Sequence, residues 1–549
     1  MSKYFSTQLE TNDNNLHPNR LAGNFGGRLL AYDLTDHLQQ SARGSLILMI
    51  GQVTSTIITA IATILVARFL GSTSYGQVAL AMIPITLANL FTNPGIRSSL
   101  IKFIAQYRTE NRASDIRTLI ITGLLINSTA GLAMLVIIFI SSGFIAREIF
   151  NQSTIQLLIQ IASANLIAHS LMTTTRSIFV GYERMEFYSL TIIVQSLLKS
   201  FLAPLLVYLG MGPLGAILGT TASTLVTGGL GLALVLLVFL RKAETNESTL
   251  SYREASRILL SHGFPLFLSI LLSGAISQIY NFLMAIYVNV SSIGNYQAAT
   301  NFTALITFFT MPISTVLFPL FSKLEPTENH MLGIVYQNSV KYAALMTVPV
   351  TMAIILLADP IVQIIYGNSY PQTAFYLQLI SINFLFIGLG SNSNGSLLNG
   401  QGKTRVIFIS NLFNLLAGLP LGLYLIPKFG IIGLIATLII APKTMLFNSL
   451  WWIRKNLGFS IDWSSSAKIF LSSGISFIIA YYLLKTAHLG EWTSLILGFG
   501  AYTLLYIFML LKLGTLEISD VYNLRRILSS LGPLTPIFNI FLKIIEKYL

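Results

Sequence analysis

The stretch SLLNGQGKTR, residues 396–405, decides between two very different predicted folds for this chain. Its Gly402-Lys403-Thr404 triplet matches the end of a phosphate-binding P-loop, which needs another glycine five positions earlier and a buried strand before it. That earlier position holds Leu397, and the preceding run has the length and apolar character of a membrane helix. The stretch is therefore interpreted as a turn between two membrane helices, and an ATPase is not predicted.

The composition around this turn is that of a polytopic membrane protein. The chain has 549 residues, of which 54% are hydrophobic and 10% charged, whereas a soluble domain carries about 25% charged residues. It contains no cysteine, which excludes disulfides and thiolate metal sites, and no metal or cofactor is expected. The net charge of +13 is interpreted as Lys- and Arg-rich cytoplasmic loops rather than as a nucleic-acid surface.

Apolar runs long enough to cross a bilayer recur along the whole chain, since about twenty apolar residues suffice for one helix. About fourteen such runs are found, at 45–70, 77–103, 115–142, 154–180, 187–209, 213–240, 258–289, 294–321, 336–358, 372–399, 405–426, 430–453, 467–486 and 492–512. Polar breaks follow the sixth run (Arg241–Arg257) and the twelfth (Lys455–Ser466). The predicted fold is an all-α membrane protein with two six-helix lobes and two extra C-terminal helices.

The predicted division of the chain follows these breaks. It comprises a cytoplasmic tail (1–44), an N-lobe (45–242), a cytoplasmic linker (243–256), a C-lobe (257–456), a further helix pair (457–513) and an amphipathic C-terminal segment (514–549). The first 44 residues are polar and mixed in charge, without the apolar stretch of a signal peptide.

The distribution of Lys and Arg predicts the orientation. Seventeen of them lie in or near the even-numbered loops, against four (Arg68, Arg147, Lys428 and Lys485) in the odd-numbered ones. Because cytoplasmic loops carry the excess of Lys and Arg, both termini and the turn at Lys403 are predicted to be cytoplasmic. The expected location is the plasma membrane, and the chain is expected to act as a monomer.

A weak internal repeat relates the two predicted lobes. Three pairs of segments correspond at offsets of 218 to 221 residues: Gly181–Arg184 with Gly400–Lys403, Gly212–Gly215 with Gly430–Gly433, and Tyr75 with Tyr296. Six helices per repeat is an even number, so both halves have the same orientation. They are predicted to be related by a pseudo-twofold axis along the membrane normal, and SLLNGQGKTR contains the second copy of a tight basic turn.

Charged residues within the predicted spans are all cationic. The twenty Asp and Glu fall in tails, loops or helix ends, whereas Arg97, Lys199 and Lys443 lie within spans. A charge at the bilayer centre costs about 2.5–3.5 kcal/mol on insertion scales and is a functional hypothesis by default. Asn93-Pro94-Gly95 is predicted to break the helix before Arg97. Arg68, at the outer end of the first span, is a weaker candidate and is interpreted mainly as an interface anchor.

These cations predict a cavity between the lobes that is positive and free of acids. Such a cavity suits an anionic substrate better than a cationic drug. For Arg97, snorkelling of the side chain to the cytoplasmic side is the alternative interpretation.

Four segments, in order along the chain, resemble motifs of the polysaccharide transporters, the oligosaccharide-lipid flippases (Wzx-like) of the multidrug/oligosaccharidyl-lipid/polysaccharide exporter superfamily. The segments are ARFLGSTSYGQVAL (67–80), SSIGNYQAATNF (291–302), ADPIVQIIYGNSY (358–370) and LLNGQGKT (397–404). The resemblance covers roughly residues 45–455. It implies two lobes that open alternately to either side of the membrane and move a polyprenyl- or dolichyl-(di)phosphate-linked oligosaccharide outward. The partners so implied are that lipid, other membrane lipids and polysaccharide-assembly proteins, with no nucleic acid.

Other functions are compatible with the same layout. A cation-coupled multidrug antiporter of the same superfamily would be expected to carry membrane-embedded Asp or Glu, and none is found. A major-facilitator carrier would usually have a Gly-, Asp- and Arg-rich loop in place of IKFIAQYRTENRASD (101–115). A membrane-bound glycosyltransferase or ligase would need a large outer loop or clustered outer acids, so an enzyme is not expected. A non-catalytic scaffold stays possible.

The C-terminal end of the chain is predicted to be an amphipathic helix. PLTPIFNIFLKIIEKYL (533–549) has apolar residues at helical spacing and Lys and Glu on another face. It is predicted to lie along the cytoplasmic leaflet, where it is a candidate docking helix for biosynthetic partners.

Overall fold

The computed structural model describes residues 21–240, 249–323, 329–487 and 489–515, together with Asp520 and Arg525. All regular structure in these ranges is helical, which confirms the predicted all-α class. The main helices are α1 (Leu21–Asn89), α2 (Ile96–Thr109), α3 (Ala113–Phe144), α4 (Gln156–Gly181), α5 (Met185–Leu206), α6 (Gly212–Leu234), α7 (Tyr252–Tyr287), α8 (Val290–Lys323), α9 (Asn329–Leu356), α10 (Ala358–Tyr366), α11 (Thr373–Leu385), α12 (Ser393–Gly400), α13 (Thr404–Leu457), α14 (Trp463–Ala487) and α15 (Glu491–Lys512).

The helices are long and apolar enough for a multi-pass membrane protein. Eight helical stretches of the described chain pass a length and hydropathy test for membrane spans, or ten if two bent pairs are counted as one span each. Three of the eight contain a sharp kink at a glycine with positive φ, at Gly71 in α1, at Gly210 between α5 and α6, and at Gly430 in α13. The predicted number of fourteen is consistent with these kinks and stays a prediction.

The two halves of the chain have the same unusual backbone conformations at equivalent positions, separated by the predicted offset. Gly212 (φ 55°, ψ −138°) and Gly430 (φ 57°, ψ −129°) adopt nearly the same rare conformation 218 positions apart. Glu183 (φ 59°) and Gly402 (φ 66°) share a left-handed turn 219 positions apart. Residues other than glycine rarely adopt positive φ, so its recurrence at equivalent positions confirms that the lobes share one architecture.

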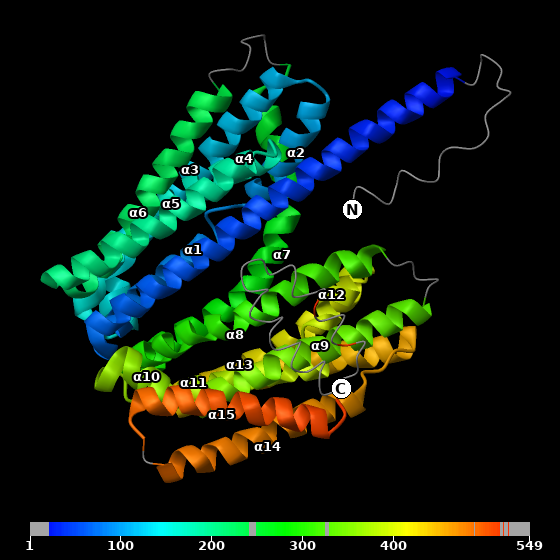
Figure 1. The fold of residues 1–549 in the computed structure, drawn as a ribbon. Coiled ribbons are helices and arrows are strands. Elements are labelled where there is room, and N and C mark those ends of the chain that lie inside the picture. Colours follow the sequence, from blue (N-terminus) through cyan, green and yellow to red (C-terminus); the bar gives the residue numbers. More distant parts are fainter. Residues whose placement is uncertain are drawn as a thin grey trace.

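The lobes meet at one end of the molecule, which we call the closed end. It comprises the kink at Gly71, the start of α8, and α10 with the residues that follow it (Figure 1). A side chain at Gly76 would overlap the carbonyl of Val290, and one at Gly294 would overlap the carbonyl of Ser72. These two contacts exchange under an offset of 218, as a twofold axis between the lobes requires. Small residues here let the backbones approach, as in other membrane helix contacts.

Hydrogen bonds between the lobes reinforce the closed end. The hydroxyls of Ser72 and Ser291 lie 3.0 Å apart. The Tyr370 hydroxyl donates to the Ala67 carbonyl at 2.6 Å, and the Asn301 amide donates to the Tyr75 hydroxyl at 3.1 Å. The largest buried apolar cluster includes residues of both lobes here, whereas separate clusters fill each lobe toward the opposite end. The helices of the two lobes diverge toward that opposite end, which we call the open end (Figure 1).

Helix α7 connects the two lobes and packs on both (Figure 1). Its segments Tyr252–Leu271 and Gly274–Tyr287 meet at 43°. In the first segment the Leu259 carbonyl accepts a hydrogen bond from the Ser99 hydroxyl at 2.8 Å. In the second, the Tyr280 ring lies against Gly418 and Gly422 of α13, where no larger residue would fit.

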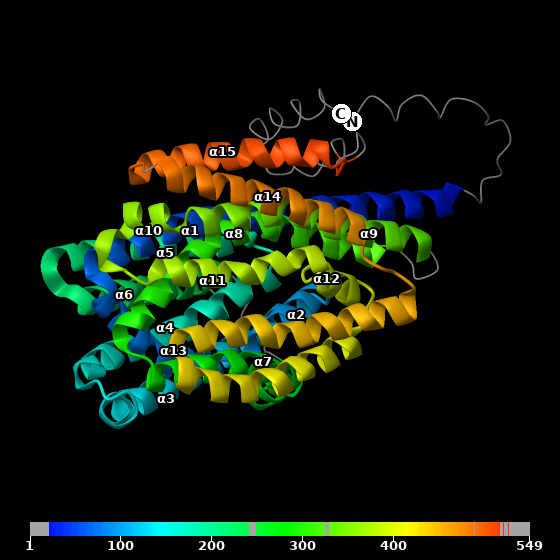
Figure 2. The same cartoon turned by 90° about the horizontal axis from the view of Figure 1, so that it is seen from below.

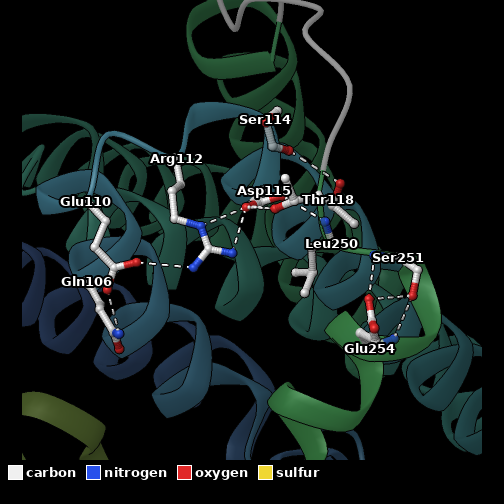
Figure 3. Close-up of polar contacts among 10 residues, drawn as sticks. Gln106, Glu110, Arg112, Ser114, Asp115, Thr118, Leu250, Ser251 and Glu254 are labelled. Atoms are coloured by element: carbon white, nitrogen blue, oxygen red, sulfur yellow. Dashed lines mark hydrogen bonds and ion pairs between the residues drawn. The ribbon is translucent and has the colours of Figure 1, made fainter.

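The start of α7 is fixed to the N-terminal lobe by a buried carboxylate (Figure 3). Asp115, 2% exposed, accepts hydrogen bonds from Arg112 Nε at 2.8 Å, the Leu250 backbone N–H at 2.9 Å and the Thr249 hydroxyl at 2.8 Å. A capping box follows, in which hydrogen bonds from the Ser251 backbone N–H and hydroxyl lower the pKa of Glu254. The end of the linker is therefore tightly held, and residues 241–248 lie outside the described chain.

Replacing Asp115 with Ala is expected to destabilise the protein by about 2–3 kcal/mol, because it leaves the buried Leu250 N–H without its acceptor and the Arg112 guanidinium with only its exposed partner Glu110. The measurement is thermal unfolding in detergent. Glu110→Gln is the control, since Glu110 pairs with Arg112 at 3.1 Å while 39% exposed, and such surface pairs contribute about 0–1 kcal/mol. Equal stability of the two variants would contradict the anchoring role of Asp115.

The C-terminal segment contacts α9 at its one described acidic residue. Asp520 accepts from Lys341 Nζ at 2.7 Å and from the Tyr342 hydroxyl at 2.9 Å. The predicted amphipathic helix at 533–549 lies outside the described residues, as do the first twenty residues of the predicted N-terminal tail. Helix α1 begins at Leu21, inside that predicted tail.

Candidate functional site

The predicted helix break before Arg97 is present and places this residue at the start of α2. Gly95 is left-handed (φ 82°), and the Arg97 backbone N–H donates to Asn93 Oδ1 at 3.2 Å. The interruption separates α1 from α2 and leaves the Arg97 side chain exposed. Non-helical backbone at this position is consistent with the lining of a cavity, and the guanidinium has no hydrogen-bond or ion-pair partner among the described residues.

A second arginine, one of the seventeen cations predicted to lie in or near the even-numbered loops, is found on α4, which packs against α2. Arg176 is inside α4, five residues before its end. Its Nη2 donates to Gln195 Oε1 at 2.9 Å, and its Nε donates to the Thr191 hydroxyl at 3.2 Å. The guanidinium also lies over the Tyr188 ring, 5.8 Å from its centroid. Three side chains of α5 thus hold Arg176 in one orientation.

Helix α4 also carries His169, and we call Arg97, His169 and Arg176 the N-terminal cluster. His169 and Arg176 are seven residues apart on α4, so they lie on the same face of the helix. The Nδ1 atom of His169 is buried and has no partner among the described residues. Guanidinium groups on two packed helices, with no carboxylate partner among the described residues, favour an anion in this part of the lobe.

Lys199 lies two turns beyond Thr191 and one turn beyond Gln195 on the same face of α5. The side chain is half-buried and makes no hydrogen bond or ion pair with a described residue. Next to it, the Ser200 hydroxyl donates to the Ile58 carbonyl of α1 at 3.1 Å. The face of α5 that orients Arg176 therefore continues to an unpaired ammonium group.

Arg68 lies apart from this cluster. It is exposed near the end of the first part of α1, beside the kink at Gly71 and the lobe contact. The structure places Arg97, Arg176 and Lys199 in the N-terminal lobe, Arg68 at the closed end and Lys443 in the C-terminal lobe. The predicted cations thus lie in both lobes and at the closed end, and their sharing of one cavity stays a prediction.

Lys443 lies in a pocket of the C-terminal lobe. Its Nζ donates to Asn383 Oδ1 at 3.0 Å and lies 3.5 Å from the centroid of the Phe386 ring. The pocket has a volume of about 160 Å³. Amide, hydroxyl and glycine positions line much of it, among them Asn383, Ser391, Asn394, Gly395 and Ser410.

This pocket lies at a break in one of the predicted spans. The run 372–399 is not one helix, because α11 and α12 meet at 50° after a short 3₁₀ turn, with Gly390 left-handed (φ 77°) between them. A Cβ at Gly390 would press on Asn394 Oδ1. The polar run SNSNGS (391–396) falls at this break and was the signal in the sequence that could have predicted it.

The cations of the site face no carboxylate among the described residues. The ion pairs found among the described residues lie elsewhere, and they are Arg108–Glu183, Arg112–Glu110, Arg112–Asp115, Arg184–Glu186 and Lys341–Asp520. Within the same residues no group of three His, Asp or Glu is arranged to hold a metal ion. The arrangement can therefore bind anionic and hydroxyl groups.

Comparison with known proteins places these features in a family context. The family model described as polysaccharide biosynthesis protein matches residues 41–325, just over half of the chain, and the MatE model matches residues 265–424. An uncharacterized membrane protein of Methanocaldococcus jannaschii is 23% identical over 80% of this chain and 88% of its own length. The probable flippase AglR of Haloferax volcanii is 24% identical over 86% of this chain and 96% of its own length.

The solved structure of the lipid II flippase MurJ in an inward closed conformation has a similar fold. It aligns with a TM-score of 0.66 at 15% identity, covering 84% of this chain and 98% of that one. At this identity the likeness concerns the fold alone, and it confirms the predicted architecture.

Proposed function

The chain belongs to the polysaccharide biosynthesis protein family, and on that premise we propose that it is a flippase for lipid-linked oligosaccharides. It moves a polyprenyl- or dolichyl-(di)phosphate-linked oligosaccharide from the cytoplasmic to the outer leaflet by alternating access. The observation that carries this proposal is the set of cations without carboxylate partners in two lobes that meet at one end. The resemblance to a probable flippase of similar length supports it.

The N-terminal cluster holds the phosphate groups of the substrate. Arg97 and Arg176 supply guanidinium groups, which bind phosphate oxygens in pairs, and Lys199 adds a point charge further along α5. The Lys- and Arg-rich open end faces the cytoplasm, so that the closed end seals the outer side while the substrate enters. Arg68 anchors the outer end of α1 at the membrane surface.

The protein is needed because a sugar head group cannot cross a bilayer unaided. Burying each hydroxyl without a partner costs roughly 2–7 kcal/mol, so several hydroxyls raise a barrier of tens of kcal/mol. Amide and hydroxyl side chains along the path replace the hydrogen bonds of water. No covalent step is required, and the protein acts as a transporter rather than as an enzyme.

A cation-coupled multidrug antiporter is the second candidate, since the MatE model matches residues 265–424. Coupling to H⁺ or Na⁺ would be expected to use a carboxylate within the membrane. The acids described within α3, α10 and α15 (Asp115, Asp359 and Glu491) lie in the first turns of these helices. This distribution supports the flippase.

The test is transport in proteoliposomes that contain the purified protein and a fluorescent polyprenyl-diphosphate-linked sugar. Exposure of the labelled lipid to a membrane-impermeant quencher or glycosidase should rise well above that of empty liposomes. Movement of a cationic dye against H⁺ or Na⁺, with no movement of the lipid-linked sugar, would establish the antiporter instead.

A further inference from the structure

The pocket around Lys443 has hydrogen-bonding capacity that the protein itself does not use. Lys443 donates one bond to Asn383, although an ammonium has three donors. The Asn383 amide nitrogen and the Ser391 hydroxyl make no hydrogen bond within the described part of the chain. These groups come from the two sides of the break between α11 and α12 and from α13.

Other polar groups of the pocket are held rigidly by second partners. Asn394 accepts from the Tyr336 hydroxyl at 2.7 Å and donates to the Ser449 hydroxyl at 2.9 Å. Asn448 donates to the Ser410 hydroxyl at 2.7 Å. Groups fixed in this way lose little freedom when they bind a ligand. The polar part of the pocket is therefore preformed, and apolar side chains such as Leu398 and Met445 line the rest.

The size of the pocket limits its ligand to one ring. A cavity of about 150 Å³ in another protein accepts a single six-membered ring, and this pocket measures about 160 Å³. Gly395 of α12 lines it, and a Cβ at this position would meet no atom within 4 Å. The missing side chain at Gly395 leaves the space that a ring would occupy.

The charge of the pocket selects the kind of ring. Lys443 is in contact with a neutral amide and an aromatic face, and none of the residues that line the pocket is acidic. Lys443 is half-buried, and an ammonium in such a place without a counter-ion favours a ligand that brings a negative charge. We propose that this pocket is a subsite for one sugar of the transported oligosaccharide, and that it selects a sugar carrying a carboxylate.

This inference rests on the proposed function, because it assigns one part of the same substrate to the C-terminal lobe. The carboxylate of the sugar accepts from Lys443, and its hydroxyls bond to Asn383 and Ser391. The phosphate groups stay with the N-terminal cluster. The pocket thus recognises the sugar, and the N-terminal lobe recognises the phosphate groups that all such lipids share.

Binding to the purified protein in nanodiscs tests this assignment without requiring transport. Three probes are compared: polyprenyl-diphosphate-glucuronate, polyprenyl-diphosphate-glucose and polyprenyl diphosphate alone. We expect the wild type to bind the glucuronate lipid about tenfold more tightly than the glucose lipid, as for one charged hydrogen bond. Gly395→Leu should fill the pocket and abolish this preference while leaving the affinity for polyprenyl diphosphate unchanged. Lys443→Gln should abolish the preference for the carboxylate.

Gly229→Leu is the matched control, because Gly229 is an exposed helical glycine of α6 whose Cβ would also meet no atom within 4 Å. It should bind all three probes like the wild type. Equal affinity of the wild type for the two sugar lipids, or a preference that survives in Gly395→Leu, would overturn the subsite. Failure to bind polyprenyl diphosphate itself would overturn the flippase proposal, and the subsite with it.

Discussion

Replacing Arg176 with Gln is expected to slow flipping of a lipid-linked sugar by about 10- to 100-fold. A hydrogen bond to a charged group contributes about 1.5–3 kcal/mol, and about 1.4 kcal/mol corresponds to a factor of ten. The guanidinium is already oriented by Gln195 and Thr191, so little reorganisation accompanies binding. The measurement is the initial rate of lipid exposure in proteoliposomes.

Two further variants separate charge from geometry. Arg176→Lys retains the charge but loses the paired donors, and it should recover only part of the rate. Arg147→Gln removes an exposed arginine that donates to Gln156 Oε1 at 3.1 Å near the closed end of the N-terminal lobe, and it should flip like the wild type. A wild-type rate for Arg176→Gln, with the variant folded, would remove the N-terminal cluster from the mechanism.

The position and the partner of Arg176 could not be predicted from the sequence. A count of Lys and Arg near helix ends assigned it to a cytoplasmic loop, because five residues from Gly181 is within the uncertainty of a helix boundary. Gln195 accepts from Arg176 across two helices, and nothing in the sequence identified this pairing. The link between Arg176 and Gln195 depends on how α4 and α5 pack, and spacing along one helix does not reveal that.

Backbone turns were more predictable than side-chain partners. The turn at Gly402 was predicted, and Gly212 and Gly430 were identified as equivalent entries to two spans. All three have positive φ, a conformation that few other residues tolerate. The break at Gly390 was missed, since the apolar residues on either side of it resemble a single span. The pocket around Lys443 depends on this break, so only Lys443 itself was identified as a candidate.

A cross-link between the lobes is the second change that we expect to have a large effect on flipping. The chain contains no cysteine, and the hydroxyls of Ser72 and Ser291 lie 3.0 Å apart at the closed end. In the double variant Ser72→Cys with Ser291→Cys, an oxidant should form a disulfide across the lobes, since their side chains already meet. Alternating access requires this end to open in every cycle. Oxidation is therefore expected to stop flipping, with at least a 100-fold loss of rate.

A reductant should restore the rate, which distinguishes a locked conformation from a damaged protein. Each single-cysteine variant, treated with the same oxidant, should keep the wild-type rate. Gly294→Val is an independent probe, because a side chain there would overlap the Ser72 carbonyl and hold the same end open. If the cross-linked protein flipped at the uncross-linked rate, the closed end would not open during transport. The substrate would then have to pass the membrane without separation of α1 and α8, and alternating access about this contact would be wrong.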